Sequence, residues 1–358
     1  MKNRREFLKA GGLGVAAGVS AGCASLSKHQ EPPTLAVSTA SYMVRQRFSR
    51  RKDLPDDVPV FRGPEHFIEH CHDLGASGVQ IGVRDWDRNG LVHRVRNQAE
   101  QYGMALEGQI SLPKQREELD EFVNQVKTAK EAGVRIFRAV CLGGRRYETF
   151  KSMAQWQEFV RHSWDRLTWV EPVMRKLGVQ LALENHKDWR IAEMVDLMRR
   201  ISSEHIGVNL DTGNNISLLD DGMQTISALA PFTITTHLKD MGVEEYEDGF
   251  RLAEVPLGEG MLDIRRIVQI CRRANSRVRF NLEMITRDPL EIPCLTERYW
   301  RTWNRPSEAA LDRALATVRR NVPAKPLQRI SHLDAKGQVE AEEINNQKSF
   351  VWFLSQFA

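Results

Sequence analysis

The feature that most constrains the fold is a repeated unit in which an amphipathic helical pattern ends at a glycine just before a short apolar run. Such glycines are Gly75, Gly103, Gly133 and Gly178. The apolar or β-branched runs are residues 35–44, 78–83, 104–112, 134–142, 179–186, 206–214, 233–241 and 278–285. This alternation is typical of β/α units around a parallel sheet. Eight units in about 250 residues predict an α/β fold, a closed (β/α)8 TIM barrel. An open doubly wound sheet is disfavoured because no G-x-G-x-x-G follows the first run.

The chain of 358 residues is long enough for this barrel and further segments. We expect residues 1–33 to be a signal peptide and linker, residues 34–306 to form the barrel, and residues 307–358 to form a C-terminal helical extension. Residues 45–63 and 286–306 leave the C-terminal ends of strands, which form the catalytic face of this architecture, so they are candidate lids or substrate walls. The apolar residues 350–354 are expected to pack on the barrel, with an oligomer contact as the alternative.

The first residues resemble an export signal. Residues 3–9 read NRREFLK, and a mild run of glycine, alanine and valine follows from residue 10 to residue 24. Paired arginines before such a run indicate twin-arginine export to the periplasm. The run is too short and too rich in glycine to span a membrane. Cys23 follows a stretch that looks like a lipoprotein cleavage box, so a lipid anchor at Cys23 and simple cleavage after Ala24 both stay open.

The charge balance argues against nucleic acid as a partner. The formal net charge is +4, but Lys2, Arg4, Arg5 and Lys9 face only Glu6 at the N-terminus. The rest of the chain holds 47 basic and 46 acidic residues. A nucleic-acid-binding domain usually carries a strong basic excess, so a small-molecule substrate is the expected partner.

The informative chemistry lies at the ends of the last four predicted barrel strands. The segments are 181–186 LALENH, 207–214 GVNLDTGN, 235–240 TTHLKD and 280–284 FNLEM. Side chains alternate between the two faces of a strand. If the apolar side chains face the helices, four polar ones face the barrel interior: Glu184, Asp211, His237 and Glu283. Each alone could cap a helix or pair with an arginine, but four in register predict convergence on one point.

This convergence predicts a metal site. Three buried carboxylates need a countercharge, and one divalent metal ion supplies it. Three oxygen ligands and one nitrogen ligand favour Mn²⁺, Co²⁺, Mg²⁺ or Zn²⁺ over metals that prefer soft ligands.

Several motifs resemble the xylose isomerase-like superfamily of sugar phosphate isomerases and epimerases. They are LENH at 183–186, DTGN at 211–214, HLKD at 237–240, PLGEG at 256–260 and LE at 282–283. The resemblance covers most of residues 34–290 and implies the same four metal ligands. In that superfamily the metal stabilises the enediolate that forms when a hydroxy-ketone loses a proton. The resemblance therefore implies a divalent-metal-dependent isomerase or epimerase of a keto-sugar, with Glu184 and Glu283 as acid/base pair. Gln80 stands where relatives often carry an acidic residue.

Further residues are candidates for catalysis or substrate binding. His186 and Lys239 each follow a ligand by two residues, so they are expected to face the same cavity as a hydrogen-bond donor or base and as an oxyanion partner. A structural role is the alternative for both. The candidates for substrate binding are Arg45 and Arg47, which could grip an anion, and Trp300 and Trp303, which could stack on a sugar ring. The alternatives are a solvated loop and core packing.

The same metal chemistry supports other activities. An exported lyase that cleaves a 3-keto-glycoside by β-elimination is one, and a sugar-acid decarboxylase is another. A DNA-repair enzyme like endonuclease IV is disfavoured because its three-metal site needs a histidine where this chain has Asn214. A non-catalytic sugar-binding module would not need the four ligands.

Overall fold

The predicted TIM barrel is present. A computed structural model describes residues 31–55, 57–303 and 307–357 of the chain, so the predicted export signal and Cys23 lie outside the described residues. Eight parallel strands close in the order β1-β10-β7-β6-β5-β4-β3-β2. The strands are β1 (Leu35–Ser38), β2 (Gly78–Gly82), β3 (Ala105–Gln109), β4 (Ile136–Ala139), β5 (Gln180–Glu184), β6 (Ile206–Asp211), β7 (Thr233–Leu238) and β10 (Arg279–Leu282).

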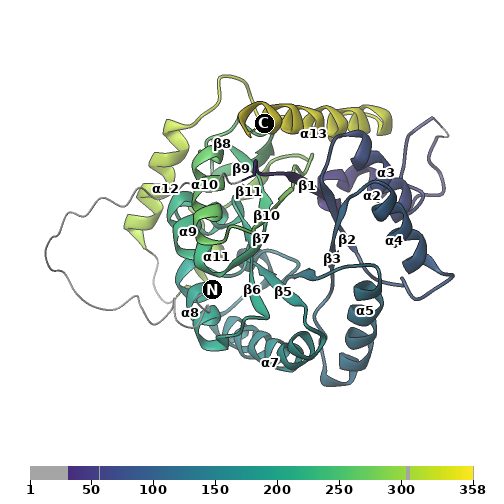
Figure 1. The fold of residues 1–358 in the computed structure, drawn as a ribbon. Helices are drawn as coiled ribbons and strands as arrows, with labels where there is room; N and C mark the ends of the chain where they lie inside the picture. Colours follow the sequence, from purple (N-terminus) through teal and green to yellow (C-terminus); the bar gives the residue numbers. More distant parts are fainter. Residues whose placement is uncertain (1–30, 56, 304–306, 358) are drawn as a thin grey trace, which may run out of the picture.

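Helices surround the barrel (Figure 1). They are α2 (Met43–Phe48), α3 (Pro64–Asp73), α4 (Leu91–Gln101), α5 (Leu119–Glu131), α6 (Arg146–Thr149), α7 (Met153–Leu177), α8 (Ile191–Ile201), α9 (Gly222–Leu229), α10 (Ile264–Ala274), α11 (Glu297–Trp300), α12 (Glu308–Arg320) and α13 (Ala335–Phe357). Short 3-10 turns are η1 (Thr39–Tyr42), η2 (Arg116–Glu118), η3 (Asn214–Leu218) and η4 (Ala230–Phe232).

Helix α10 illustrates why these segments are helical. The Asp263 side chain accepts a hydrogen bond from the Arg266 amide and so caps the first turn. Ile264, Ile267 and Cys271 follow at helical spacing, and all are buried against the barrel core. The amphipathic pattern therefore fixes which face of the helix covers the strands.

Several predicted runs extend beyond the observed strands, and two of these differences change the path of the chain. The first run was expected to stay extended to residue 44, but β1 ends at Ser38 and the chain turns into η1 and α2. Ser41 stabilises this turn because its hydroxyl donates to the Leu282 carbonyl at 2.8 Å and accepts from the Met284 amide at 3.0 Å. The seventh run was expected to reach residue 241, but β7 ends at Leu238 and a separate strand starts at Asp240.

That separate strand belongs to a second, antiparallel sheet of order β11-β9-β8. It consists of β8 (Asp240–Tyr246), β9 (Gly249–Val255) and β11 (Leu290–Ile292). The sheet was not predicted. It rises from the ends of β7 and β10, so it stands at the end of the barrel where the predicted ligands lie.

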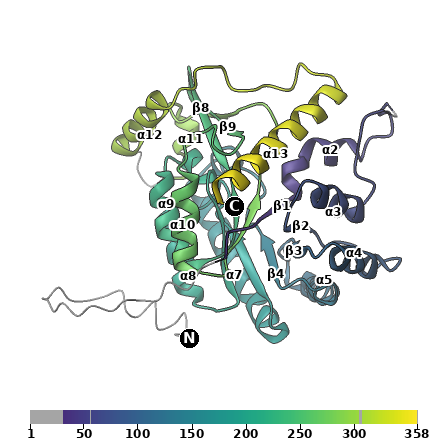
Figure 2. The same ribbon diagram turned by 45° about the horizontal axis from the view of Figure 1, so that its top comes forward.

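The C-terminal helix α13 packs back on the barrel, as predicted from its apolar end. Phe350 and Phe353 are buried in the main core. Glu342 accepts hydrogen bonds from the Val44 and Arg45 amides at 2.5 and 3.2 Å. Both views show α13 lying close to α2 and α3 (Figures 1 and 2). The helix therefore holds the segment that follows β1. Among the described residues, no helix combines the length and apolar character needed to cross a membrane.

Candidate metal centre

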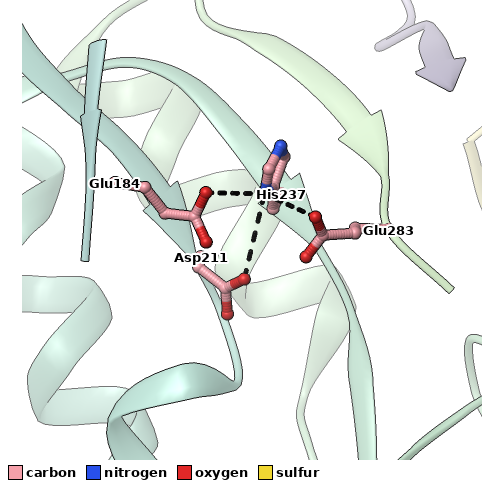
Figure 3. A group of neighbouring side chains, drawn as sticks. All are labelled: Glu184, Asp211, His237 and Glu283. Atoms are coloured by element: carbon pink, nitrogen blue, oxygen red, sulfur yellow. Dashed lines mark ion pairs between the residues drawn. The ribbon is translucent and has the colours of Figure 1, made fainter. Parts of the chain in front are cut away.

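Four side chains from neighbouring strands meet inside the barrel. Glu184, Asp211 and His237 end or nearly end β5, β6 and β7, and Glu283 follows β10 by one residue. One ligand atom from each lies within 4.8 Å of all the others, and all four side chains are buried. Figure 3 shows Glu184 and Glu283 on opposite sides of His237, with Asp211 beside them. The predicted convergence is therefore confirmed.

The buried atoms at this point fit a metal ion. His237 Nδ1 lies 3.2 Å from Glu184 Oε2, 3.1 Å from Glu283 Oε1 and 3.9 Å from Asp211 Oδ2. Neither His237 Nδ1 nor Asp211 Oδ2 has a partner with hydrogen-bond geometry among the described residues. Such buried atoms are costly to leave without a partner. In the described part of the chain this quartet is the one group of at least three acidic, histidine or cysteine side chains that could hold a metal.

The surrounding polar groups orient the ligands. Asp211 Oδ1 accepts hydrogen bonds from the Gly213 and Asn214 amides at 2.9 and 2.8 Å, which directs Oδ2 toward the centre. His237 Nε2 lies 2.7 Å from Gln80 Oε1. Because an amide oxygen only accepts, Nε2 carries the proton and Nδ1 faces the other ligands.

Deeper in the barrel, Glu107 holds Gln80 in place. The Gln80 amide nitrogen donates to Glu107 Oε2 at 3.1 Å. Thr235 and Asn281, which precede His237 and Glu283 by two residues, donate to the same carboxylate. A layer of polar side chains thus supports the layer of ligands above it.

All four ligands are buried, but their pKa values shift in different directions. Burial raises the pKa of Asp211 to about 6. Burial also opposes ionisation of Glu184 and Glu283, but nearby cations hold both pKa values below the usual range. Burial alone would lower the pKa of His237, yet Glu283 and Glu184 outweigh it and raise the pKa to about 9. A metal ion therefore has to displace a proton from His237.

Two cationic side chains balance the carboxylates. Lys239 Nζ lies 2.9 Å from Asp211 Oδ2 and 2.6 Å from Glu283 Oε2. Its pKa is raised, because these carboxylates outweigh the effect of burial. Arg138 Nε donates to Glu184 Oε2 at 2.5 Å. Lys239, predicted as an oxyanion partner, thus lies at the centre.

His186 follows the last residue of β5, Glu184, by two residues and is half-buried. Burial, followed by the charge of Lys187, lowers the pKa of His186 to about 3, so the imidazole is neutral. Its Nδ1 is buried and has no hydrogen-bond partner among the described residues. A neutral imidazole with an unused ring nitrogen suits the predicted roles of donor or base, which stay a prediction.

The four residues predicted to bind substrate make other contacts. Arg45 Nη2 pairs with Glu343 Oε2 at 2.5 Å, and Arg47 Nη2 donates to Gln338 Oε1 at 2.5 Å, so both reach α13. The remaining two, Trp300 and Trp303, lie in an aromatic group with Tyr299. The contacts of the two tryptophans match the alternative of packing, whereas the two arginines lie in α2 and contact α13, which differs from the alternative of a solvated loop. Substrate binding by these four residues stays a prediction.

The sequence did not predict a role in the centre for three further side chains: Arg138, Gln80 and Asn214. Arg138 pairs in register with Ala182, which precedes Glu184 by two residues on the inward face, so alternation along β4 could have found it. Gln80 could have been found from alternation on β2 in the same way. Asn214 donates to Glu184 Oε1 at 3.0 Å from a 3-10 turn, where no alternation applies.

Comparison with known proteins agrees with this architecture. A family model described as xylose isomerase-like TIM barrel matches residues 68–320. The chain belongs to the xylose isomerase-like TIM barrel family. The family assignment confirms the resemblance seen in the motifs of the second half of the chain.

Three proteins illustrate what this chain is similar to. A stretch of 105 residues is 28% identical to 3-oxo-isoapionate decarboxylase of Pectobacterium atrosepticum and spans 29% of this chain and 38% of that relative. A xylose isomerase-like TIM barrel protein of Mycobacterium smegmatis, solved with magnesium, has a TM-score of 0.53 at 16% identity and covers 81% of this chain and 98% of its own. The 3-keto-D-glucoside 4-epimerase of E. coli has a TM-score of 0.53 at 14% identity, with coverages of 80% and 99%. These structural likenesses show the fold. The chain thus has the xylose isomerase-like barrel fold with a buried group of side chains that could bind a metal ion.

Proposed function

We propose that this protein is a divalent-metal-dependent isomerase or epimerase of a keto-sugar. The observation that carries the proposal is the position of two carboxylates. Glu184 Oε2 and Glu283 Oε1 approach His237 Nδ1 from opposite sides, at 3.2 and 3.1 Å (Figure 3). Two bases on opposite sides of one centre can remove a proton from one face of a carbon and return a proton to the other face.

The metal, held by Glu184, Asp211, His237 and Glu283, would act as a Lewis acid toward adjacent substrate oxygens. The rest of the chemistry falls to the side chains. Both glutamates are ionised at neutral pH because their pKa values are low, so either can accept the proton of a C–H bond next to a carbonyl. The other glutamate, after it takes a proton from solvent, delivers that proton to the same or the neighbouring carbon, and the first glutamate releases its proton to solvent, so that the proton count is unchanged.

Neighbouring groups would assist this transfer. Arg138 and Asn214 hold the two oxygens of Glu184, which fixes the orientation of its carboxylate. Lys239 lies against Glu283 and could stabilise negative charge that develops on a substrate oxygen. His186 could donate a hydrogen bond to the substrate from its neutral imidazole.

A lyase or decarboxylase is the second candidate. The observation in its favour is the curated relative named as a decarboxylase. Proton abstraction next to a ketone leads to epimerisation, but it leads to β-elimination when the neighbouring carbon carries a leaving group. A 3-keto-glycoside would then release its aglycone.

Exchange of substrate hydrogen with solvent tests the proposal. We would incubate the Mn²⁺-loaded protein with D-fructose, D-psicose and a 3-keto-D-glucoside in D₂O, and follow deuterium incorporation and aglycone release. We expect deuterium to enter at the carbon next to the carbonyl, only with metal, and to fall at least about 100-fold in Glu283→Gln. Glu259→Gln, which alters an exposed ion pair with Lys348, is the control. Exchange that needs no metal, or full exchange in a folded Glu283→Gln, would refute the proposal.

The site of action is a further part of the proposal. We place the protein in the periplasm on the basis of the NRREFLK pattern at residues 3–9. Cell fractionation of wild type and of a variant with Arg4 and Arg5 changed to lysine tests it. Equal periplasmic amounts of both would contradict twin-arginine export.

A further inference from the structure

Two buried ammonium groups beside the metal centre converge on a single neutral oxygen. Lys187 Nζ and Lys239 Nζ both donate to Asn214 Oδ1, the second at 3.4 Å. Lys187 is 4% exposed and Lys239 is 2% exposed. Like charges this close in a poorly solvated region repel each other strongly unless an anion lies near both.

The nearby carboxylates form ion pairs with Lys239, whereas Lys187 forms none among the described residues. Lys239 pairs with Asp211 and Glu283 and lies 3.5 Å from Glu254 Oε1 on β9. Glu254 in turn forms two hydrogen bonds with the Arg287 guanidinium, at 2.7 and 3.2 Å. Among the described residues, Lys187 has no carboxylate within ion-pair distance, and Asn214 is its hydrogen-bond acceptor. A buried ammonium in this position retains two unused donors.

The net charge of the whole centre also favours binding of an anion. Four cationic side chains face four carboxylates there: Arg138, Lys187, Lys239 and Arg287 against Glu184, Asp211, Glu254 and Glu283. A divalent ion bound to the quartet would therefore leave two positive charges in excess in a buried region. A neutral sugar would leave this excess uncompensated, whereas an anionic substrate would reduce it.

We propose that Lys187 and Lys239, joined through Asn214, form an anion-binding site that holds a carboxylate of the substrate. This inference rests on the proposed function and narrows it: the substrate is a keto-sugar acid and not a neutral keto-sugar. Asn214 places the anion site next to the reaction centre, because its amide nitrogen donates to the metal ligand Glu184 at 3.0 Å. The carboxylate and the keto group of one sugar acid could occupy the two sites together.

The test compares two probes that differ in one charge. D-gluconate and D-glucitol have the same number of carbons, and only the first carries a carboxylate. We would measure both dissociation constants by calorimetry with the Mn²⁺-loaded protein. We expect gluconate to bind at least about tenfold more tightly than glucitol, since a hydrogen bond between charged groups is worth about this much. Equal affinities of the wild-type protein for the two probes would overturn the inference.

A variant distinguishes binding of the carboxylate by Lys187 from direct binding of the carboxylate to the metal. Lys187→Met removes the charge and retains most of the volume, and we expect it to weaken gluconate binding at least about tenfold with glucitol binding unchanged. Lys130→Met is the matched control, because the Lys130 ammonium also donates to a neutral carbonyl, that of Leu177, but away from this centre. Unchanged gluconate binding in Lys187→Met would overturn the inference.

The same samples distinguish this failure from failure of the proposed function. Bound Mn²⁺ and metal-dependent deuterium exchange are measured alongside the calorimetry. A wild-type protein that binds metal and shows exchange but does not prefer gluconate, or a Lys187→Met variant that keeps the preference, overturns the anion site alone. A wild-type protein that holds no metal or shows no exchange overturns the proposed function itself.

Discussion

His237 Nε2 donates a hydrogen bond to Gln80 Oε1 at 2.7 Å, across the barrel from β7 to β2. This contact decides which ring nitrogen faces the carboxylates. With the proton held on Nε2, Nδ1 offers its lone pair to a metal once the second proton has left. Gln80 itself is held by Glu107, so the orientation of one ligand depends on side chains from three strands.

Removing the Gln80 acceptor should weaken metal binding. In Gln80→Met the imidazole loses the contact that fixes its tautomer and orientation, so we expect Mn²⁺ affinity to fall about 10- to 100-fold. The control is Gln109→Met on the neighbouring strand, which donates to Gln80 and Ser38 and is expected to have a smaller effect. Mn²⁺ titration followed by calorimetry measures both. Equal affinity in wild type and Gln80→Met would contradict the orienting role.

Lys239 should stabilise the protein most when metal is absent. Its ammonium lies 2.9 Å from Asp211 Oδ2 and 2.6 Å from Glu283 Oε2. In Lys239→Met the carboxylates lose this countercharge, and we expect a loss of about 3 kcal/mol in the free energy of unfolding in chelator. Added Mn²⁺ should then raise the Tm of the variant more than that of wild type.

The control for that experiment is Lys348→Met. Lys348 pairs with Glu259 at 3.1 Å with both side chains about half exposed, so the expected loss is below about 1 kcal/mol. A Lys239→Met protein that matches wild type in chelator, or gains no extra Tm from Mn²⁺, would show that the ammonium does not balance the quartet.

The contribution of Glu342 to the free energy of unfolding should fall as pH rises. Burial raises the pKa of Glu342 from its ordinary 4.5 to about 8. Between these values the unfolded chain has released this proton and the folded chain retains it. The contribution of Glu342 is therefore complete below about pH 4.5 and is lost as pH rises to about 8. Unfolding of wild type and Glu342→Gln by urea at pH 5 and pH 8 measures the effect.

The expected result is a difference that changes with pH. Wild type should lose on the order of 2 kcal/mol relative to Glu342→Gln between the two pH values. Glu343→Gln is the control, because the pKa of Glu343 is lowered by His70 and Arg45 against the effect of burial. Its own contribution is complete above the ordinary value of 4.5, so the difference between wild type and Glu343→Gln should stay nearly constant from pH 5 to pH 8. A constant difference between wild type and Glu342→Gln would exclude the proposed titration.

Gly258 should be essential for packing of α13. Its φ is +85°, and an added Cβ would lie 2.0 Å from Trp352 Nε1. Gly258→Ala should therefore cost about 2–4 kcal/mol, from the unfavourable backbone and the displaced helix. Gly75→Ala has a similar φ of +88° with nothing within 4 Å, so it should cost only about 1–2 kcal/mol. Urea unfolding compares them, and equal losses would mean that contact with Trp352 is unimportant.

Local patterns predicted the parts of the site that strands create. Alternation along β5 to β7 and β10 placed Glu184, Asp211, His237 and Glu283 on the inner face, and the barrel brought them together. The same patterns could not show that the chain after His237 forms the β8–β9 hairpin, because the apolar run continues from β7 into β8. The sequence therefore did not predict that Glu254, on β9, lies next to the site.

Ion pairs between residues far apart in the sequence were also not predicted. Arg45 lies in a segment that reads as a solvated loop, yet its guanidinium pairs with Glu343 near the other end of the chain. No local pattern connects residues so far apart in sequence. The contact depends on the packing of α13 against α2 in the folded chain.

The most direct test of the central claim is the position of a metal in a crystal grown with Mn²⁺. We predict one anomalous difference peak per chain, about 2.0–2.4 Å from ligand atoms of Glu184, Asp211, His237 and Glu283. The peak should vanish in His237→Ala crystals grown in the same way. Absence of a peak between these four side chains in the wild-type protein, or a peak bound elsewhere, would contradict the account.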